Sequence, residues 1–205
     1  MGSRPHLIPA FHAAALRRTG VATLSLLMFV GCSPTLQAPL RGPDGAGPDS
    51  GDHRLDHGYT LLMDLLADEA RVADILGLKS ASPSTEEILR DISSAASEGS
   101  VDLAAMRSKA PPIVVGSTGL PILEIDARNR LRNQETVGLL LSGGTSFELR
   151  ILLTQEKASG YVAALADGLA SADPNPARRD RLSKLSRRFL GLNAELRQRL
   201  AVKSD

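Results

Sequence analysis

Aromatic residues, histidine and cysteine are scarce in this sequence, and each scarcity limits what the chain can do. Its 205 residues include no Trp, 2 Tyr, 4 Phe and 1 Cys. The core must therefore be built mainly from aliphatic side chains, and a composition rich in Leu, Ala and Arg favours helices. None of the 4 His lies beyond position 57. A domain beyond that position lacks the base of serine triads and the Glu-x-x-His pairs of di-metal helical bundles.

Acidic residues are absent before position 44, whereas Arg4, Arg17 and Arg18 are basic. The apolar stretch that follows, from Val21 to Gly31, is 11 residues long. A positive segment followed by an apolar stretch too short to span a bilayer is typical of a secretory signal. We therefore predict that residues 1–31 are a signal peptide that is removed.

The single cysteine follows this stretch directly. Phe29, Val30, Gly31 and Cys32 resemble the lipobox of bacterial lipoproteins, in which a bulky apolar residue lies three places before Cys and small residues lie just before it. The family usually has Leu at the position of Phe29. The resemblance implies cleavage before Cys32, a diacylglycerol on its sulfur and, usually, a further acyl chain on the new amino group. Two or three chains hold a protein at a bilayer far more firmly than one.

The residue after Cys32 bears on where the protein is sorted. It is Ser33, whereas Asp at this place would, in the best-known bacterial sorting rule, mean retention at the inner membrane. The resemblance therefore implies the outer membrane, with the domain facing the periplasm. The alternatives to lipidation are an inert Cys in an uncleaved helix or a disulfide between two chains.

Residues 32–57 are rich in Pro and Gly and poor in apolar side chains. Such a segment cannot bury enough surface to offset the entropy of ordering it, so we predict a lipidated Cys and a flexible tether.

Near the end of this segment, His53 and His57 are four residues apart, with Asp52 and Asp56 beside them. On a helix this spacing could bind a divalent metal ion. A loose segment offers no preorganised geometry, however, and we interpret Asp56 or Gly58 as the start of the first helix. Metal binding by the His pair stays open.

Helical periodicity begins at Tyr59. It predicts helices over 59–78, 83–107, 122–141, 146–171 and from about 176 onward, with a Pro-rich loop over 109–121. The second helix would begin with Ser82 before Pro83, or with Ser84 and Glu87. We therefore predict one all-α domain over 58–205, a four- to five-helix bundle. The predicted inner positions include Leu62, Leu65, Leu66, Ile88, Ile92, Ala95, Ala96, Gly99, Leu103, Met106, Leu123, Ala127, Leu131, Leu141, Phe147, Ile151, Tyr161, Leu165, Leu169, Leu182, Leu185, Phe189, Leu192 and Leu196.

The segment from Ser142 to Ser146 contains two glycines between two predicted helices. A phosphate cradle at a helix N-terminus has this outline, but no Lys follows the glycines as it does in nucleotide-binding loops. We interpret the segment as a helix stop at Gly143 followed by a Thr or Ser cap.

The stretch "LLSGGTSFELRILLTQEKASGYV", with the Pro-interrupted break and final helix after it, resembles the periplasmic four-helix proteins of the DUF4142 type. Those proteins often have Phe followed by Asp where this chain has Phe147 and Glu148. The resemblance covers about the last 150 residues and implies a ferritin-like bundle, without a defined activity.

Carboxylates in the predicted bundle show no spacing of a metal site. We place Glu69, Glu98, Glu124, Glu148 and Glu156 on polar faces, so no metal or other cofactor and no catalytic residue is predicted. A carboxylate pair such as Asp64 with Asp68, or Glu86 with Glu87, leaves open an enzyme of unknown type.

Charge is unevenly distributed along the chain. Of 24 basic and 23 acidic residues, the predicted signal holds three basic ones, which leaves 21 against 23 and a net charge of −2. This balance gives no reason to expect a nucleic acid partner. The last helix is nevertheless strongly basic, and it would either neutralise the acidic first helix or meet anionic lipid headgroups or cell-wall polymer. The candidate contact residues are Arg178, Arg181, Lys184, Arg187 and Arg188.

These observations together predict a lipid-anchored cell-envelope protein with a structural or binding role and no catalytic chemistry. The alternatives are a helical adaptor or sensor that binds a protein partner, and the carboxylate enzyme mentioned above.

Overall fold

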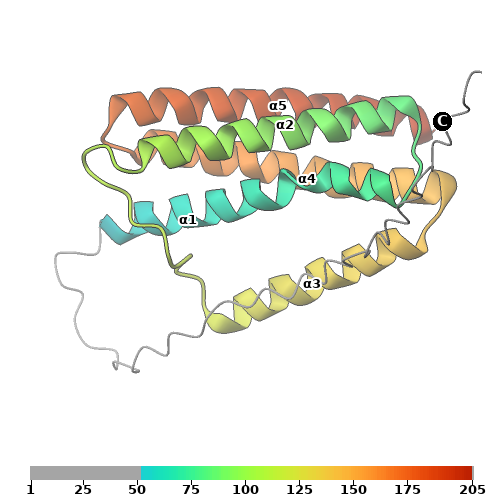
Figure 1. Ribbon diagram of the computed structural model, residues 1–205, viewed down its shortest axis with the longest axis horizontal. Coiled ribbons are helices and arrows are strands. Elements are labelled where there is room, and N and C mark those ends of the chain that lie inside the picture. The colour runs from blue at the N-terminus through green and yellow to red at the C-terminus, as the bar shows by residue number, and fades with distance from the viewer. Residues whose placement is uncertain (1–51, 205) are drawn as a thin grey trace, which may run out of the picture. The chain divides into compact units, whose positions relative to one another are not determined.

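The computed structural model describes residues 52–204, and this range contains helices and no strand (Figure 1). In chain order the elements are α1 (Asp52–Glu69), the short 3-10 helix η2 (Val72–Gly77), α2 (Pro83–Met106), α3 (Ile122–Leu141), α4 (Gly144–Ala172) and α5 (Pro176–Ser204). The predicted all-α class is confirmed. The predicted signal peptide, Cys32 and most of the predicted tether lie outside the described residues.

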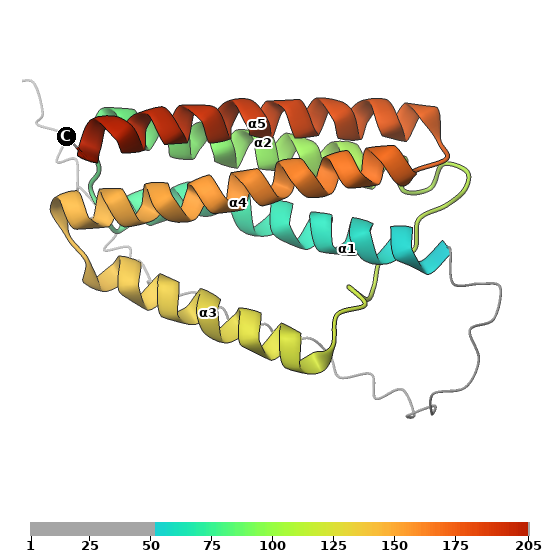
Figure 2. The same ribbon diagram turned by 180° about the vertical axis from the view of Figure 1, so that it is seen from behind.

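Four helices form the bundle, and α3 stands apart from them. The longest two, α4 and α5, each have 29 residues, which is about 44 Å of helix, and they lie antiparallel and side by side. α1 packs against α2 and α4, and α2 packs against α5. In both views α3 diverges from the bundle toward its own N-terminal end (Figures 1 and 2).

The main core is mostly aliphatic, as the composition predicted. Among its fully buried members are Leu62, Ile92 and Leu196, with Tyr59 and Phe189 as its aromatic residues. In α2 all seven predicted inner positions are buried. One of them is Gly99, where a Cβ atom would lie 2.8 Å from Cδ1 of Leu185, so the small residue lets α2 and α5 approach closely.

The first helix begins earlier than the sequence indicated. α1 starts at Asp52, so residues 52–57, which the sequence analysis assigned to the tether, are helical. Gly and Pro mark the segment before Asp52, and their density hid the boundary. Part of the added turn packs on the core, because Leu55 is half-buried against it.

The predicted inner face of α3 is wrong. Leu123, Leu131 and Leu141 are 82%, 61% and 82% exposed, and Ala127 is exposed too; the only buried residue of α3 is Leu139. Tyr161 on α4, also predicted inside, is 39% exposed. α3 contacts α1 through an ion pair, Arg132 with Asp68, and not through an apolar face.

The start of α2 lies at one of the two predicted places, with Ser82 as its N-cap residue, but the Ser82 side chain makes no capping bond to the helix. Ser82 precedes Pro83, which occupies the first helical turn. The carboxylate of Glu148 on α4 accepts the backbone N–H of Ser82 at 2.5 Å and its hydroxyl at 2.9 Å, and Lys203 on α5 also donates to it. Burial raises the pKa of Glu148, but the bonds from Lys203 and Ser82 outweigh this and hold it below its usual value. Glu148 therefore joins three helices rather than facing solvent as predicted.

The break between α3 and α4 lies where the sequence predicted a helix stop, but the predicted Thr or Ser cap is wrong, because the N-cap of α4 is Gly143 and no side chain makes a capping bond there. α3 ends at Leu141 and α4 begins at Gly144, whose φ of +55° is the left-handed conformation that glycine adopts without strain.

Candidate functional site

The predicted site residue Cys32 lies outside the described residues, so the structure leaves lipidation as a prediction. None of the helices in residues 52–204 combines the length and apolar character that a membrane span needs. The candidate surfaces that the structure does describe are the basic last helix, the His pair, a buried carboxyl group and α3.

The basic last helix contains one residue that cannot belong to a surface. Arg178, predicted as a contact for an anionic partner, is 0% exposed. Its Nε and Nη2 donate to the two carboxylate oxygens of Asp173 at 2.7 and 2.9 Å, and Nη1 donates to the carbonyls of Lys109 and Pro111 at 2.8 and 2.6 Å. The guanidinium is thus committed to bonds within the fold, and Arg178 is removed from the candidate surface.

Tyr59 completes this buried network. Its hydroxyl donates to Asp173 Oδ2 at 2.5 Å, and the Asn175 backbone N–H donates to Oδ1 at 2.7 Å. Burial raises the pKa of Asp173, but the bonds from Arg178 and Tyr59 outweigh it and leave the pKa below its usual value. For Tyr59, burial and the bond to Asp173 both raise the pKa. The network joins α1, the 107–116 loop and the α4–α5 turn, which is a structural role.

Sequence reasoning missed this network because its members come from three distant parts of the chain. One local signal was present: Asp173 lies just before the Pro-containing turn and Arg178 lies in the first turn of α5. This spacing lets the short Asp173 side chain reach Arg178.

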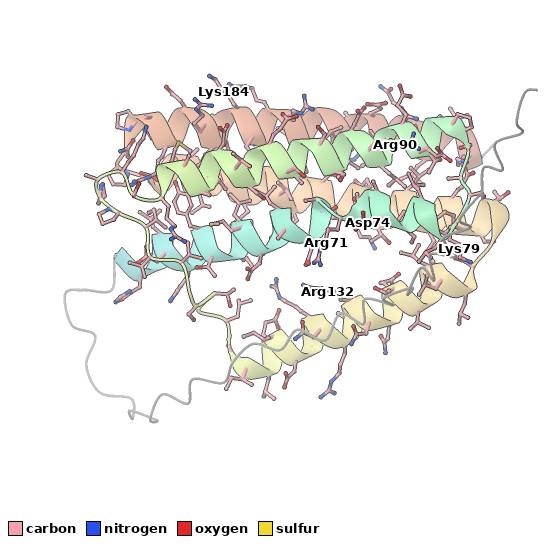
Figure 3. The ribbon with its side chains drawn as sticks, viewed as in Figure 1. Arg71, Asp74, Lys79, Arg90, Arg132 and Lys184 are labelled. Atoms are coloured by element: carbon pink, nitrogen blue, oxygen red, sulfur yellow. The ribbon has the colours of Figure 1, made fainter. Side chains whose placement is uncertain are left out.

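The remaining basic residues of α5 define the basic face: Arg181, Lys184, Arg187 and Arg188. All four are exposed, and Lys184 points away from the bundle (Figure 3). Arg181 pairs with Asp102 on α2 at 3.0 Å, whereas within residues 52–204 no carboxylate pairs with the other three. Arg181, Lys184 and Arg188 also line an open groove of about 150 Å³ between α2 and α5, opposite Glu98 and Asp102. Three cations on one face that form no ion pair within residues 52–204 create a positive surface that attracts anions.

The His pair lies on the first turns of α1. The rings of His53 and His57 are stacked, with 6.3 Å between their centroids. The backbone of Gly119, at φ +68°, packs on His57 so closely that a Cβ atom there would lie 2.2 Å from Nδ1. In the part of the chain that the structure describes, no three His, Cys, Asp or Glu residues converge as metal ligands. Because both residues lie on α1, the two rings are held in a fixed arrangement, which was not expected for a loose tether. The ring of His57, however, packs against the backbone of Gly119 in the loop before α3.

Glu69 was predicted on a polar face, and this is wrong. It is 7% exposed and lies against Gln155 of α4, which is 4% exposed. Burial, reinforced by the nearby Asp68 carboxylate, raises the pKa of Glu69 to about 7. Within residues 52–204, no hydrogen-bond partner is present for Glu69 Oε2, Gln155 Oε1 or Ser159 Oγ. The spacing of Leu62, Leu66 and Glu69 was the signal, because steps of four and three share one helix face.

Polar contacts hold α3 beside the bundle. Arg132 extends from α3 toward α1 and pairs with Asp68 at 3.0 Å (Figure 3). At the other end, Lys79 donates to the carbonyl of Ser142 at 3.0 Å, close to where Leu139 is buried. α3 is therefore fixed to the bundle near its C-terminal end, and its N-terminal end carries exposed apolar residues.

An open groove of about 460 Å³ lies between the first turns of α1 and the last turns of α4. It is lined mostly by small and aliphatic residues, with Arg54 at its edge. The groove offers no converging acid–base groups, so its chemistry is that of an apolar surface.

No family model, no curated protein and no solved structure matches this chain. The resemblances to the lipobox and to the DUF4142 type remain predictions from the sequence.

Proposed function

We propose that this protein is a lipid-anchored component of the bacterial cell envelope, held by an acylated Cys32 at the outer membrane and facing the periplasm, with a structural or binding role. The observation that carries the proposal is the motif from Phe29 to Cys32 directly after a short apolar stretch. A helical domain that begins 20 residues after Cys32, at Asp52, agrees with it. The proposal assigns no catalytic chemistry and no cofactor to the chain.

Intact-mass spectrometry of the protein purified from membranes tests the anchor. We expect a mature chain that begins at Cys32 and carries the mass of a diacylglycerol and a further acyl group. A Cys32→Ser variant, the matched control, should carry neither. A wild-type chain that begins at Met1 and lacks acyl mass would overturn the proposal.

The basic face of α5 supports a binding role toward an anionic polymer of the envelope. Three of its cations have no carboxylate partner within the described helices, and Lys184 is directed away from the core. Sedimentation with isolated cell-wall polymer at increasing salt tests this role. Arg187→Glu together with Arg188→Glu should weaken binding at least about tenfold at low salt. Arg90→Glu, an exposed arginine of α2, should change it little, and equal effects of both variants would refute the role.

An adaptor for a protein partner is the second candidate function, and the exposed apolar side chains in the middle of α3 are the observation that favours it. Leu131 and Val137 are 61% and 54% exposed. If an adaptor is correct, replacing both with Glu should abolish stoichiometric co-purification with one envelope protein. If the protein has only an anchored structural role, no such partner is present to lose.

A further inference from the structure

The end of the bundle at which the chain enters from the predicted anchor is built from several separate segments. α1 begins there at Asp52, and the 107–121 loop, the α4–α5 turn and the start of α3 lie toward the same end (Figures 1 and 2). The buried Tyr59–Asp173–Arg178 network joins three of these segments, and the contact of Gly119 with His57 holds the segment just before α3 against α1. We call this the entry end.

The length of chain between Cys32 and α1 selects this end over the opposite one. As the flexible tether that the sequence predicts, 20 residues have a root-mean-square span of about 22 to 27 Å. The long helices α4 and α5 are about 44 Å in length. An anchor at Cys32 therefore holds the entry end near the bilayer in every orientation of the domain, whereas the opposite end comes near it only when the bundle lies along the bilayer or is inverted.

The entry end carries large apolar side chains that the fold leaves exposed. Val114 in the loop is 68% exposed, and Ile122 and Leu123 in the first turn of α3 are 77% and 82% exposed. The divergence of α3 from the bundle makes its first turn protrude (Figure 2). Adjacent exposed apolar residues on a protruding turn can enter the boundary between headgroups and acyl chains, about 5 to 10 Å deep.

We propose that the entry end, through Val114, Ile122 and Leu123, inserts into the interface of the bilayer that holds Cys32, and so fixes the orientation of the domain. This inference rests on the lipid anchor of the proposed function. In this orientation the basic face, which lies along the side of the bundle on α5, is directed to the periplasmic space and not to the lipid.

Charge does not drive this contact. The exposed basic residues of the segments that meet at the entry end are Arg54, Arg107, Lys109 and Arg179. The acidic residues there are the exposed Glu124, Asp126 and Asp180 and the half-buried Asp56. The two sets balance, and Asp56 already accepts the backbone N–H of Val114 at 2.8 Å. Insertion should therefore occur in uncharged bilayers and should not depend on salt.

Single labelled cysteines on α3 test the orientation in the lipidated full chain, because an acylated Cys32 has no free thiol. Leu123→Cys and Leu141→Cys are matched: both residues are Leu, both are 82% exposed, and they lie at opposite ends of one helix. Lys184→Cys reports on the basic face. Each variant is purified from membranes, labelled with an environment-sensitive fluorophore and reconstituted into phosphatidylcholine vesicles with or without brominated acyl chains.

We expect brominated lipid to lower the emission of the label at 123 by about twofold or more and to leave the labels at 141 and 184 nearly unchanged, because quenching requires insertion. Quenching at 123 should be the same at about 0.05 M and about 0.5 M salt. An unquenched label at 123, equal quenching at 123 and 141, strong quenching at 184, or loss of quenching with salt would each overturn the inference. Intact mass of the same samples separates the two proposals: acylated Cys32 with no quenching at 123 refutes only the orientation, whereas a chain without acyl mass refutes the anchor and the orientation together.

Discussion

Replacing Glu69 by Gln should stabilise the protein at neutral and alkaline pH. Glu69 lies on the inner face of α1 and is 7% exposed, with Gln155 beside it. The Oε2 atom of Glu69 and the Oε1 atom of Gln155 both lack a hydrogen-bond partner within residues 52–204. A protonated Glu69 has a hydrogen to donate to Gln155, and an ionised one does not. Gln at position 69 keeps the shape and supplies a permanent donor.

The magnitude follows from the pKa. Burial, with the repulsion from Asp68, raises the pKa of Glu69 from 4.5 to about 7. Between these values the folded state holds a proton that the unfolded state has lost, so the free energy of unfolding falls as pH rises. At about 1.4 kcal/mol for each pKa unit, this difference in pKa corresponds to about 3 kcal/mol. This group's contribution is fully present below about pH 4.5 and is lost by about pH 7.

Urea unfolding followed by far-ultraviolet circular dichroism measures this effect. At pH ~4 the Glu69→Gln variant and the wild type should have nearly equal free energies of unfolding, and at pH ~8 the variant should be more stable by about 2 to 3 kcal/mol. Glu98→Gln, an exposed carboxylate on α2, should show no such pH-dependent gain. A variant that is less stable than the wild type at pH ~8, or a gain that is the same at both pH values, would refute the reasoning.

Three further predictions concern stability and use the same unfolding assay. Arg178→Ala should cost about 3 to 5 kcal/mol, because it leaves the Asp173 carboxylate buried without its partner, whereas Arg188→Ala should change stability by less than ~0.5 kcal/mol. Leu139→Ala should cost about 2 to 5 kcal/mol and Leu141→Ala less than ~0.5 kcal/mol, since only the first side chain is buried; equal losses would contradict the placement of α3. The lowered pKa of Glu148 means that its stabilisation is present above its ordinary pKa and is lost as pH falls through the lower folded value. Glu148→Gln should therefore lose less stability than the wild type on acidification from neutral pH, and an identical acid profile would exclude this contribution.

The exposed part of the basic last helix was predicted from the sequence, but its buried arginine was not. The exposure of Lys184, Arg187 and Arg188 was expected, since charged residues between the apolar positions of a helix face solvent. Arg178 has the same chemistry and the same helix, yet it is buried, because Asp173 and the carbonyls of the 107–116 loop surround it. When the partners of a side chain come from distant parts of the chain, the sequence around that side chain shows no pattern that predicts them.

Residue spacing and the positions of glycine and proline were enough to predict the helical class, the break around Gly143 and the buried positions of α2. These are local properties: residue spacing sets which side chains share a helix face, and glycine or proline sets where a helix can end. Three features depend on contacts between distant segments and were not predicted: α3 stands away from the bundle, Glu69 is buried and Arg178 faces inward. A helix face is buried only where another element covers it, and the position of that covering element depends on the whole fold.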